Sequence, residues 1–180
     1  MKARFKLAKF HSLLLAGSVL IASNSMADVF SYDQGALPDA KPWTAAEFQN
    51  KPEEFQFVVI GDRTGGANQE QTFKLAIDQL NLLQPEFVIN VGDTIEGYSD
   101  DKAELNAEWD EVDAMLAELD MPFFRVPGNH DIANKVAQEV WRERHGATHY
   151  HFVYNDTLFL VLDSEDPPRE APEGIKESLE

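Results

Sequence analysis

Apolar residues along this chain form short continuous runs that alternate with longer stretches of helical spacing. The short runs are rich in β-branched and aromatic residues and stop at turn-forming residues, as is typical of buried strands. Apolar positions that recur every three or four residues predict amphipathic helices between them. The predicted strands are 55–60, 87–91, 123–126, 149–154 and 157–162, and the predicted helices are 69–83, 103–119 and 133–144. This order predicts an α/β domain whose sheet is largely parallel and covered on both faces.

Three local signals refine this pattern. Residues 28–54 contain three prolines, so we predict a largely irregular segment, in which Thr44–Glu47 has capping-box spacing and predicts one short helix. Between the last two strands, Asn155–Asp156 predicts a hairpin turn. Residues 175–180 begin what resembles another helix without a C-terminal stop signal. We therefore expect residues 55–180 to be the N-terminal part of a truncated domain.

The first 27 residues predict a secretory signal peptide. Basic residues come first, an apolar run follows at 13–22, and 25–27 place small residues where signal peptidase cuts. The apolar run is about half as long as the roughly 20 residues that a membrane-spanning helix needs, which favours cleavage over a membrane anchor. We expect a mature chain without an integral membrane segment, exported to the periplasm or secreted.

Composition limits the chemistry of any site. The 180 residues contain no cysteine, which excludes disulfides, thiolate metal sites and cysteine nucleophiles. The formal net charge of −17 argues against binding to a nucleic acid scaffold or an anionic membrane, because both need a cationic surface. A bound metal ion can reverse the field locally, so anionic substrates stay compatible with this charge. Any metal must be held by oxygen and imidazole.

Three predicted parallel strands end in polar loops, in each of which a glycine precedes a polar residue. The loops are Gly61–Gly66, Gly92–Gly97 and Gly128–Asp131. Glycine lets the backbone turn sharply and approach a ligand closely. Because the carboxyl ends of parallel strands share one edge, Asp62, Asp93 and Asn129 should converge there. A lone Gly-Asp is more often a turn, but three such loops favour a site for a divalent metal such as Mn, Fe, Zn or Mg.

These loops resemble the motifs of the calcineurin-like metallophosphoesterases. That family's pattern is D-x-H, then G-D-x-x-(D/E), then G-N-H-(D/E), followed by a lone histidine and a G-H-x-H loop. Residues 92–96 match the second motif and 128–131 match the third completely. The resemblance runs from about 55 to 165 and includes 162–165, which looks like a strand end common in the family. It implies a four-layer α/β/β/α fold of two sheets flanked by helices, here incomplete at the C-terminus.

The resemblance also implies roles for individual residues. Two divalent metal ions would be held by Asp62 on the first, Asp93 bridging both, and Asn129 on the second. His130 would lie beside the phosphate as an acid or charge stabiliser, and Asp131 would orient its ring. The implied reaction is the hydrolysis of a small phosphate mono- or diester, in which the metal pair generates a hydroxide nucleophile.

One departure from the family pattern concerns the first metal. Thr64 stands where the first motif usually has histidine, so this metal loses a nitrogen ligand. The related purple acid phosphatases also lack that histidine but place a tyrosine three residues after the bridging aspartate. That position is Glu96 here, and Tyr98 lies nearby but out of register. Arg63 and Thr64 are candidate contacts to substrate phosphate, although an arginine after a strand is more often part of an ion pair.

A second departure is that the lone histidine and the G-H-x-H loop are absent because the chain stops. His145, His149 and His151 come earlier than the family would place these ligands. The alternation of His149 and His151 predicts one face of a strand, where histidines are more often solvated or hydrogen-bonded than metal-bound. We expect the 180-residue chain to bind metal weakly and hydrolyse little, and a version extended past Glu180 to be active.

Two other functions fit parts of the sequence. Thr64 and the short chain are compatible with an inactive phosphatase-like protein that binds a phosphorylated ligand without turnover. A nucleotide-binding domain of flavodoxin or Rossmann type would also be α/β. However, 61–66 does not fit G-x-G-x-x-G and has no lysine for a Walker loop. Such a domain would also leave 128–131 unexplained, so we favour the phosphoesterase.

Overall fold

The computed structural model describes residues 29–165, except 38, 46, 50–51 and 65–71. The predicted signal peptide at 1–27 and the predicted helix at 175–180 lie outside these residues. In chain order the elements are β1 (Phe30–Tyr32), the 3₁₀ turn η2 (Pro52–Glu54), β2 (Phe57–Ile60), α1 (Thr72–Leu83), β3 (Phe87–Asn90), α2 (Lys102–Leu116), β4 (Phe123–Phe124), α3 (Lys135–His145), β5 (Tyr150–Tyr154) and β6 (Thr157–Val161). Each strand and helix predicted between 55 and 162 is present in this part of the chain.

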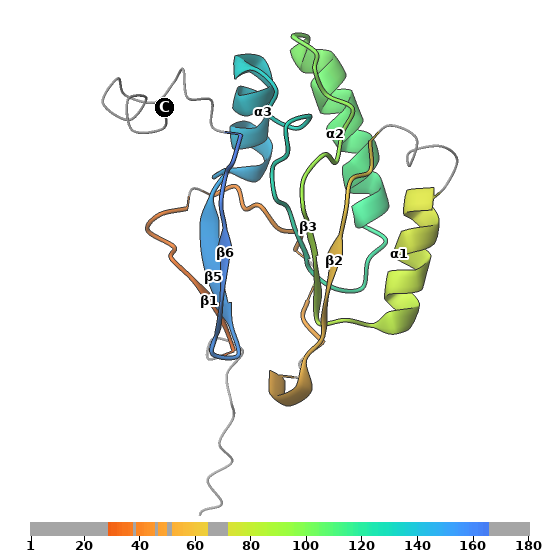
Figure 1. Cartoon of the computed structure of the whole chain (residues 1–180), viewed down its shortest axis with the longest axis vertical. Coiled ribbons are helices and arrows are strands. Elements are labelled where there is room, and N and C mark those ends of the chain that lie inside the picture. Colours follow the sequence, from red (N-terminus) through yellow and green to blue (C-terminus); the bar gives the residue numbers. More distant parts are fainter. Residues whose placement is uncertain (1–28, 38, 46, 50–51, 65–71, 166–180) are drawn as a thin grey trace, which may run out of the picture.

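Two three-stranded sheets face each other, and helices cover the parallel one (Figure 1). The parallel sheet has the order β2-β3-β4, and the antiparallel sheet has the order β1-β5-β6. Helices α1 and α2 lie on the face of the parallel sheet that points away from the antiparallel sheet, and α3 packs against α2. The mixed α/β class is therefore confirmed. A four-layer arrangement needs helices over the outer face of the antiparallel sheet as well. It stays a prediction, because Leu158 and Leu160 on β6, and Leu162 just after it, are exposed.

Parallel pairing aligns the carboxyl ends of β2, β3 and β4. Ile60 pairs with Asn90, and Ile89 pairs with Phe124, so the last residues of the three strands lie side by side. The described loops that leave the sheet at this edge are 61–64, 91–98 and 125–131. They meet at the upper end of the sheet in Figure 1. This is the convergence that the strand order predicts.

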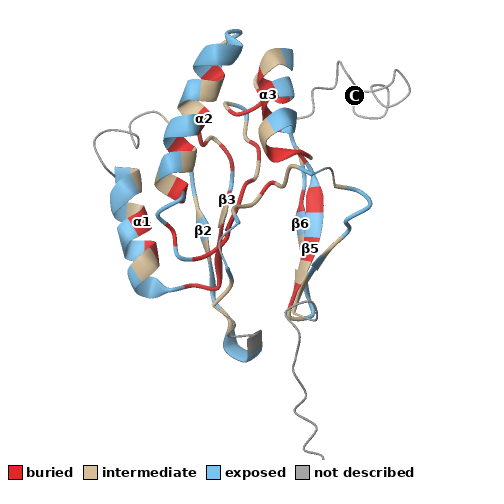
Figure 2. Ribbon diagram, turned by 180° about the vertical axis from the view of Figure 1, so that it is seen from behind, coloured by how far each residue is buried: buried red, intermediate tan, exposed pale blue. Residues whose placement is uncertain are grey.

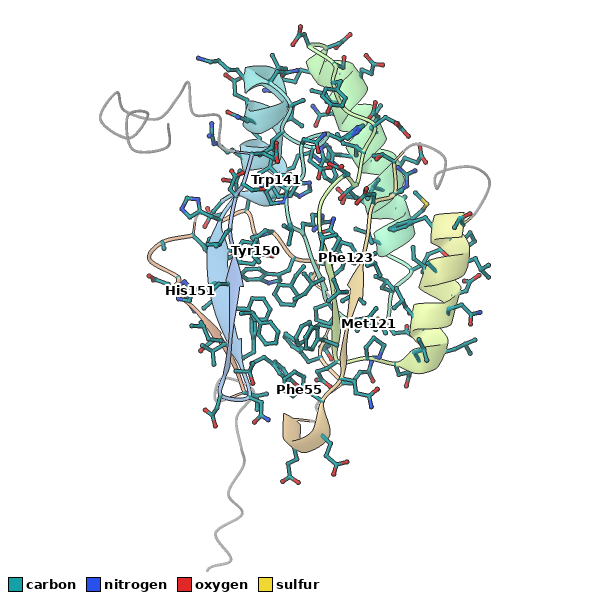
Figure 3. All side chains as sticks on the ribbon, viewed as in Figure 1. Phe55, Met121, Phe123, Trp141, Tyr150 and His151 are labelled. Carbon is teal, nitrogen blue, oxygen red and sulfur yellow. The ribbon has the colours of Figure 1, made fainter. Side chains whose placement is uncertain are left out.

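Two apolar cores hold the layers together. The first lies between the helices and the parallel sheet and contains Trp109 and Trp141. The second lies between the two sheets and is largely aromatic: Phe124 stacks on Phe152 with ring centroids 4.1 Å apart. Figure 2 shows buried residues on the helix sides that face the sheet and along the inner strands. In Figure 3, Phe55 and Tyr150 point into the space between the sheets.

The segment at 28–54 differs from its prediction in two places. It contains strand β1, which pairs antiparallel with β5 and was not predicted. The prediction of a short helix at Thr44–Glu47 was wrong, since the described residues there are not helical. Instead, the Thr44 hydroxyl accepts a hydrogen bond from the backbone N–H of Phe123, and the backbone N–H of Thr44 donates to the Phe123 carbonyl, both at 3.0 Å. The Thr44 hydroxyl, which the local pattern assigned to a helix cap, thus bonds to the backbone of strand β4 instead.

The hairpin between β5 and β6 is confirmed. Asn155 and Asp156 have φ angles of 44° and 60°, as a tight turn of primed type requires at both central positions. Strand β4 is shorter than predicted, and after it the backbone N–H of Val126 donates to the side-chain Oδ1 of Asn90 at 2.6 Å. Within the described ranges, no helix combines the length and apolar character needed to cross a bilayer.

Candidate metal and phosphate site

The loops after β3 and β4 lie in direct backbone contact. A Cβ on Gly92 would lie 2.6 Å from the Cα of Gly128, and a Cβ on Gly128 would lie 2.2 Å from Oδ1 of Asp93. Both distances are shorter than side chains tolerate, so these two glycines are needed for the approach. By contrast, a Cβ on Gly61 would meet no atom of the described residues within 4 Å. Two of the three glycines therefore permit close contact between the loops, and the close approach to a ligand stays a prediction.

Asp131 joins the same two loops with its buried carboxylate. Oδ1 accepts the backbone N–H groups of Thr94 at 2.9 Å and Ile95 at 3.2 Å, and Oδ2 accepts that of Gly128 at 2.8 Å. Burial raises the pKa of Asp131 to about 6, since it disfavours the charged form, and the three backbone hydrogen bonds oppose that rise. Asp131 thus fixes the shape of both loops.

Asp93 connects the first loop, which contains Asp62 and Arg63, to this pair of loops. Its Oδ1 accepts the backbone N–H of His130, and its carbonyl accepts the backbone N–H of Arg63, both at 3.0 Å. Because Asp62 directly precedes Arg63, the first loop runs beside Asp93. Asp93 also has a φ of 53°, a strained conformation for a residue other than glycine. The structure therefore brings together the three loops that carry Asp62, Asp93 and Asn129.

His130 is oriented by a main-chain carbonyl. Its Nδ1 lies 2.6 Å from the carbonyl oxygen of Glu96. Because a carbonyl oxygen can only accept a hydrogen bond, Nδ1 carries the proton, and Nε2 is the ring nitrogen that does not take part in this bond. Sequence reasoning gave this orienting task to Asp131, but in the structure the carboxylate of Asp131 bonds to loop backbone instead. The ring of Tyr98 meets the His130 ring edge-on, with centroids 4.5 Å apart.

Asn129 is held through the amide nitrogen of its side chain. Nδ2 donates to the hydroxyl of Tyr98 at 2.5 Å, and within the described residues Oδ1 has no hydrogen-bond partner. Asn129 and Asp62 are exposed and Asp93 is half-buried. Among the residues described here, no three or more His, Asp or Glu side chains form a group able to hold a metal. The predicted set instead comprises two carboxylates and one amide oxygen, a donor chemistry that suits a hard divalent cation.

Arg63 points beneath the loops rather than out of them. Its buried guanidinium donates to the carbonyl of Thr94 at 3.2 Å and to the carboxylate of Glu111 on α2 at 2.5 Å. It also lies over the ring of Phe73 on α1, 5.7 Å from the centroid. In this arrangement Arg63 ties the first loop to the helices, and a contact with phosphate stays a prediction for it and for the half-buried Thr64.

Two residues near the site were missed by sequence reasoning. Asn90 is buried at the end of β3, where Nδ2 donates to the Thr94 hydroxyl at 2.7 Å and Oδ1 accepts the Val126 N–H at 2.6 Å. Its signal was a single amide in an otherwise apolar strand. Tyr98, which contacts both Asn129 and His130, lies out of register with the tyrosine of the purple acid phosphatases, so its spacing gives no signal.

The other histidines occupy different surroundings. His145 is buried against the rings of Trp109 and Trp141, at centroid distances of 4.5 and 5.0 Å. His149 and His151 are exposed, and His151 pairs with Leu160 and points away from the space between the sheets (Figure 3).

Comparison with known proteins identifies the domain. A family model described as calcineurin-like phosphoesterase matches residues 55–171, which is more than half of the chain and includes all three loops. No match was found among curated proteins or among solved structures.

Proposed function

Because the chain belongs to the calcineurin-like phosphoesterases, we propose that it is a metal-dependent hydrolase of small phosphate mono- or diesters with a dinuclear metal centre. Asp62 binds one cation, Asn129 binds the other, and Asp93 bridges them. The observation that supports this proposal is the bonding of Asp93 to the backbone of both neighbouring loops, since these loops carry Asp62 and Asn129.

The donors have free oxygens for this role. Within the described residues, Asp93 uses Oδ1 to accept one backbone N–H, and Oδ2 has no hydrogen-bond partner. The candidate cations are Mn, Mg, Fe and Zn, of which oxygen donors favour Mn and Mg, whereas imidazole suits Fe and Zn. When bound, such a metal pair polarises the phosphoryl group and supplies a hydroxide near neutral pH. Three protein ligands are fewer than two cations need, so the proposal requires ligands in addition to these three residues.

His130 is the proposed proton donor. With Nδ1–H bonded to the Glu96 carbonyl, the protonated ring has its Nε2–H left to donate to the leaving alkoxide or to a phosphoryl oxygen. Asp131 supports this by fixing the loop that carries His130. The Thr64 hydroxyl is the proposed phosphate contact of the first loop, whereas Arg63 would reach a phosphate only by releasing Glu111. We further propose that the enzyme is exported after cleavage at residue 27.

The test is hydrolysis of aryl phosphate mono- and diesters while Mn²⁺ is titrated. Asp93→Asn should abolish metal-dependent turnover, because it removes the bridging negative charge. Asp156→Asn is the matched control: it makes the same change at the hairpin tip, where asparagine tolerates positive φ. Undiminished metal-dependent turnover in Asp93→Asn would contradict the proposal. Metal-dependent phosphate binding without turnover would support the inactive binding protein instead.

A further inference from the structure

Tyr98 has a backbone conformation and an exposure that its own folding does not explain. Its φ of 56° is unfavourable for an aromatic residue, and the residue is 62% exposed, so burial does not offset the strain. The preceding Gly97 also has a positive φ of 59°, and a Cβ there would lie 2.0 Å from the carbonyl oxygen of His130. The loop thus turns tightly against the His130 backbone, and strain of this kind is concentrated at functional sites.

The Tyr98 hydroxyl bonds to the nitrogen of the Asn129 amide. Because Nδ2 donates to this hydroxyl, Oδ1 points in a different direction within the amide plane and is left to bind another group. A flipped amide would present its NH₂ group there instead, and that group repels a cation. Without the hydroxyl, water can accept from Nδ2 in either orientation.

The Tyr98 ring also contacts His130. The two rings meet edge to face at 66°, while the bond from Nδ1 to the Glu96 carbonyl holds the histidine from another side. One exposed and strained tyrosine therefore touches both the proposed ligand Asn129 and the proposed proton donor.

We propose that Tyr98 is a positioning residue of the metal site, whose hydroxyl holds the Asn129 amide with Oδ1 toward the cation. The inference rests on the proposed function, since it assumes that Asn129 is a ligand. It assigns no direct metal contact to the tyrosine.

The test uses the full chain with Tyr98→Phe, which keeps the ring and removes only the hydroxyl. Mn²⁺ binding is measured by calorimetry. The NMR signals of the Asn129 side-chain amide are followed without metal, and they are assigned as those that disappear in Asn129→Asp. We expect the Kd for Mn²⁺ to rise roughly tenfold, as for other groups that orient a ligand. We also expect the amide signals to move toward those of a solvated asparagine. Tyr32→Phe, on β1, is the control and should change neither.

The two proposals fail in distinguishable ways. If either the Mn²⁺ affinity or the amide signals stay at wild-type values in Tyr98→Phe, the positioning role is overturned. If Asp93→Asn still loses Mn²⁺ binding in that case, the proposed metal site survives. A wild-type chain that binds no Mn²⁺ overturns both.

Discussion

Between the two sheets, Phe87, Phe124 and Phe152 bury whole rings against one another, whereas the loops at the carboxyl edge of the parallel sheet are held by hydrogen bonds to Asp131 and Asp93. The aromatic region is stabilised by apolar area removed from water, which depends little on direction. The loop region depends on a few polar atoms at short distances. A mutation in the aromatic region should therefore lower the stability of the fold, and one in the loop region should chiefly change the geometry of the site.

The largest expected effect is in the aromatic region. Phe87 is fully buried and packs against the rings of Phe124, Phe152, Tyr154 and Phe159. Phe87→Ala should lower the free energy of unfolding by about 3–5 kcal/mol, because it removes apolar contacts and leaves a cavity. Urea denaturation followed by tryptophan fluorescence measures this loss. A loss below about 1 kcal/mol would mean that the two sheets do not depend on this packing.

The next effect separates geometry from stability at the loops. Gly128→Ala places a methyl group 2.2 Å from Oδ1 and 2.4 Å from the backbone nitrogen of Asp93, so the loops must move apart. We expect about 1–3 kcal/mol of destabilisation, typical of overpacking, together with loss of Mn²⁺ binding.

Gly61→Ala is the matched control for that substitution. A Cβ at residue 61 meets no atom within 4 Å in the part of the chain that the structure describes, so both stability and Mn²⁺ binding should stay near wild type. Equal Mn²⁺ affinities for Gly61→Ala and Gly128→Ala would show that the contact between the second and third loops does not shape the site.

The loop convergence could be predicted because it follows from strand order. A parallel sheet brings its carboxyl ends to one edge, so Asp93 and Asn129 needed no knowledge of side-chain contacts to be placed near each other. The contacts within the site were less accessible. The partner of the His130 ring is the carbonyl of Glu96, and a main-chain acceptor leaves no trace in residue type. The contact of Tyr98 with Asn129 depends on a positive φ that an aromatic residue rarely adopts.

The misses in the fold have a similar cause. Strand β1 has three residues and exists because β5, far along the chain, offers an edge to pair with. Thr44 has the residue type of a helix cap, yet Phe123 provides both partners for its hydrogen bonds. In each case a distant partner competes with the local pattern and determines the result.

The smallest expected effect is the change in stability that His145 causes for each pH unit. It tests what happens when a polar group lies in an aromatic region. It is buried against two tryptophans, and Nε2 has no hydrogen-bond partner among the described residues. Burial lowers its pKa to about 2, with the cations of Arg125 and Arg144 adding to the shift.

This depressed pKa predicts a loss of stability in acid. The unfolded chain binds a proton at His145 below about pH 6.5 and the folded chain does not, so stability falls as pH decreases from 6.5 toward 2. The loss approaches about 1.4 kcal/mol for each pH unit in that range. His145→Leu has no such proton to bind, so its unfolding free energy should fall less steeply between pH 7 and 5, as measured by urea denaturation. Parallel pH profiles for the two proteins would mean that His145 becomes protonated in the folded state, and that the helix core admits a charge which the aromatic contacts were expected to exclude.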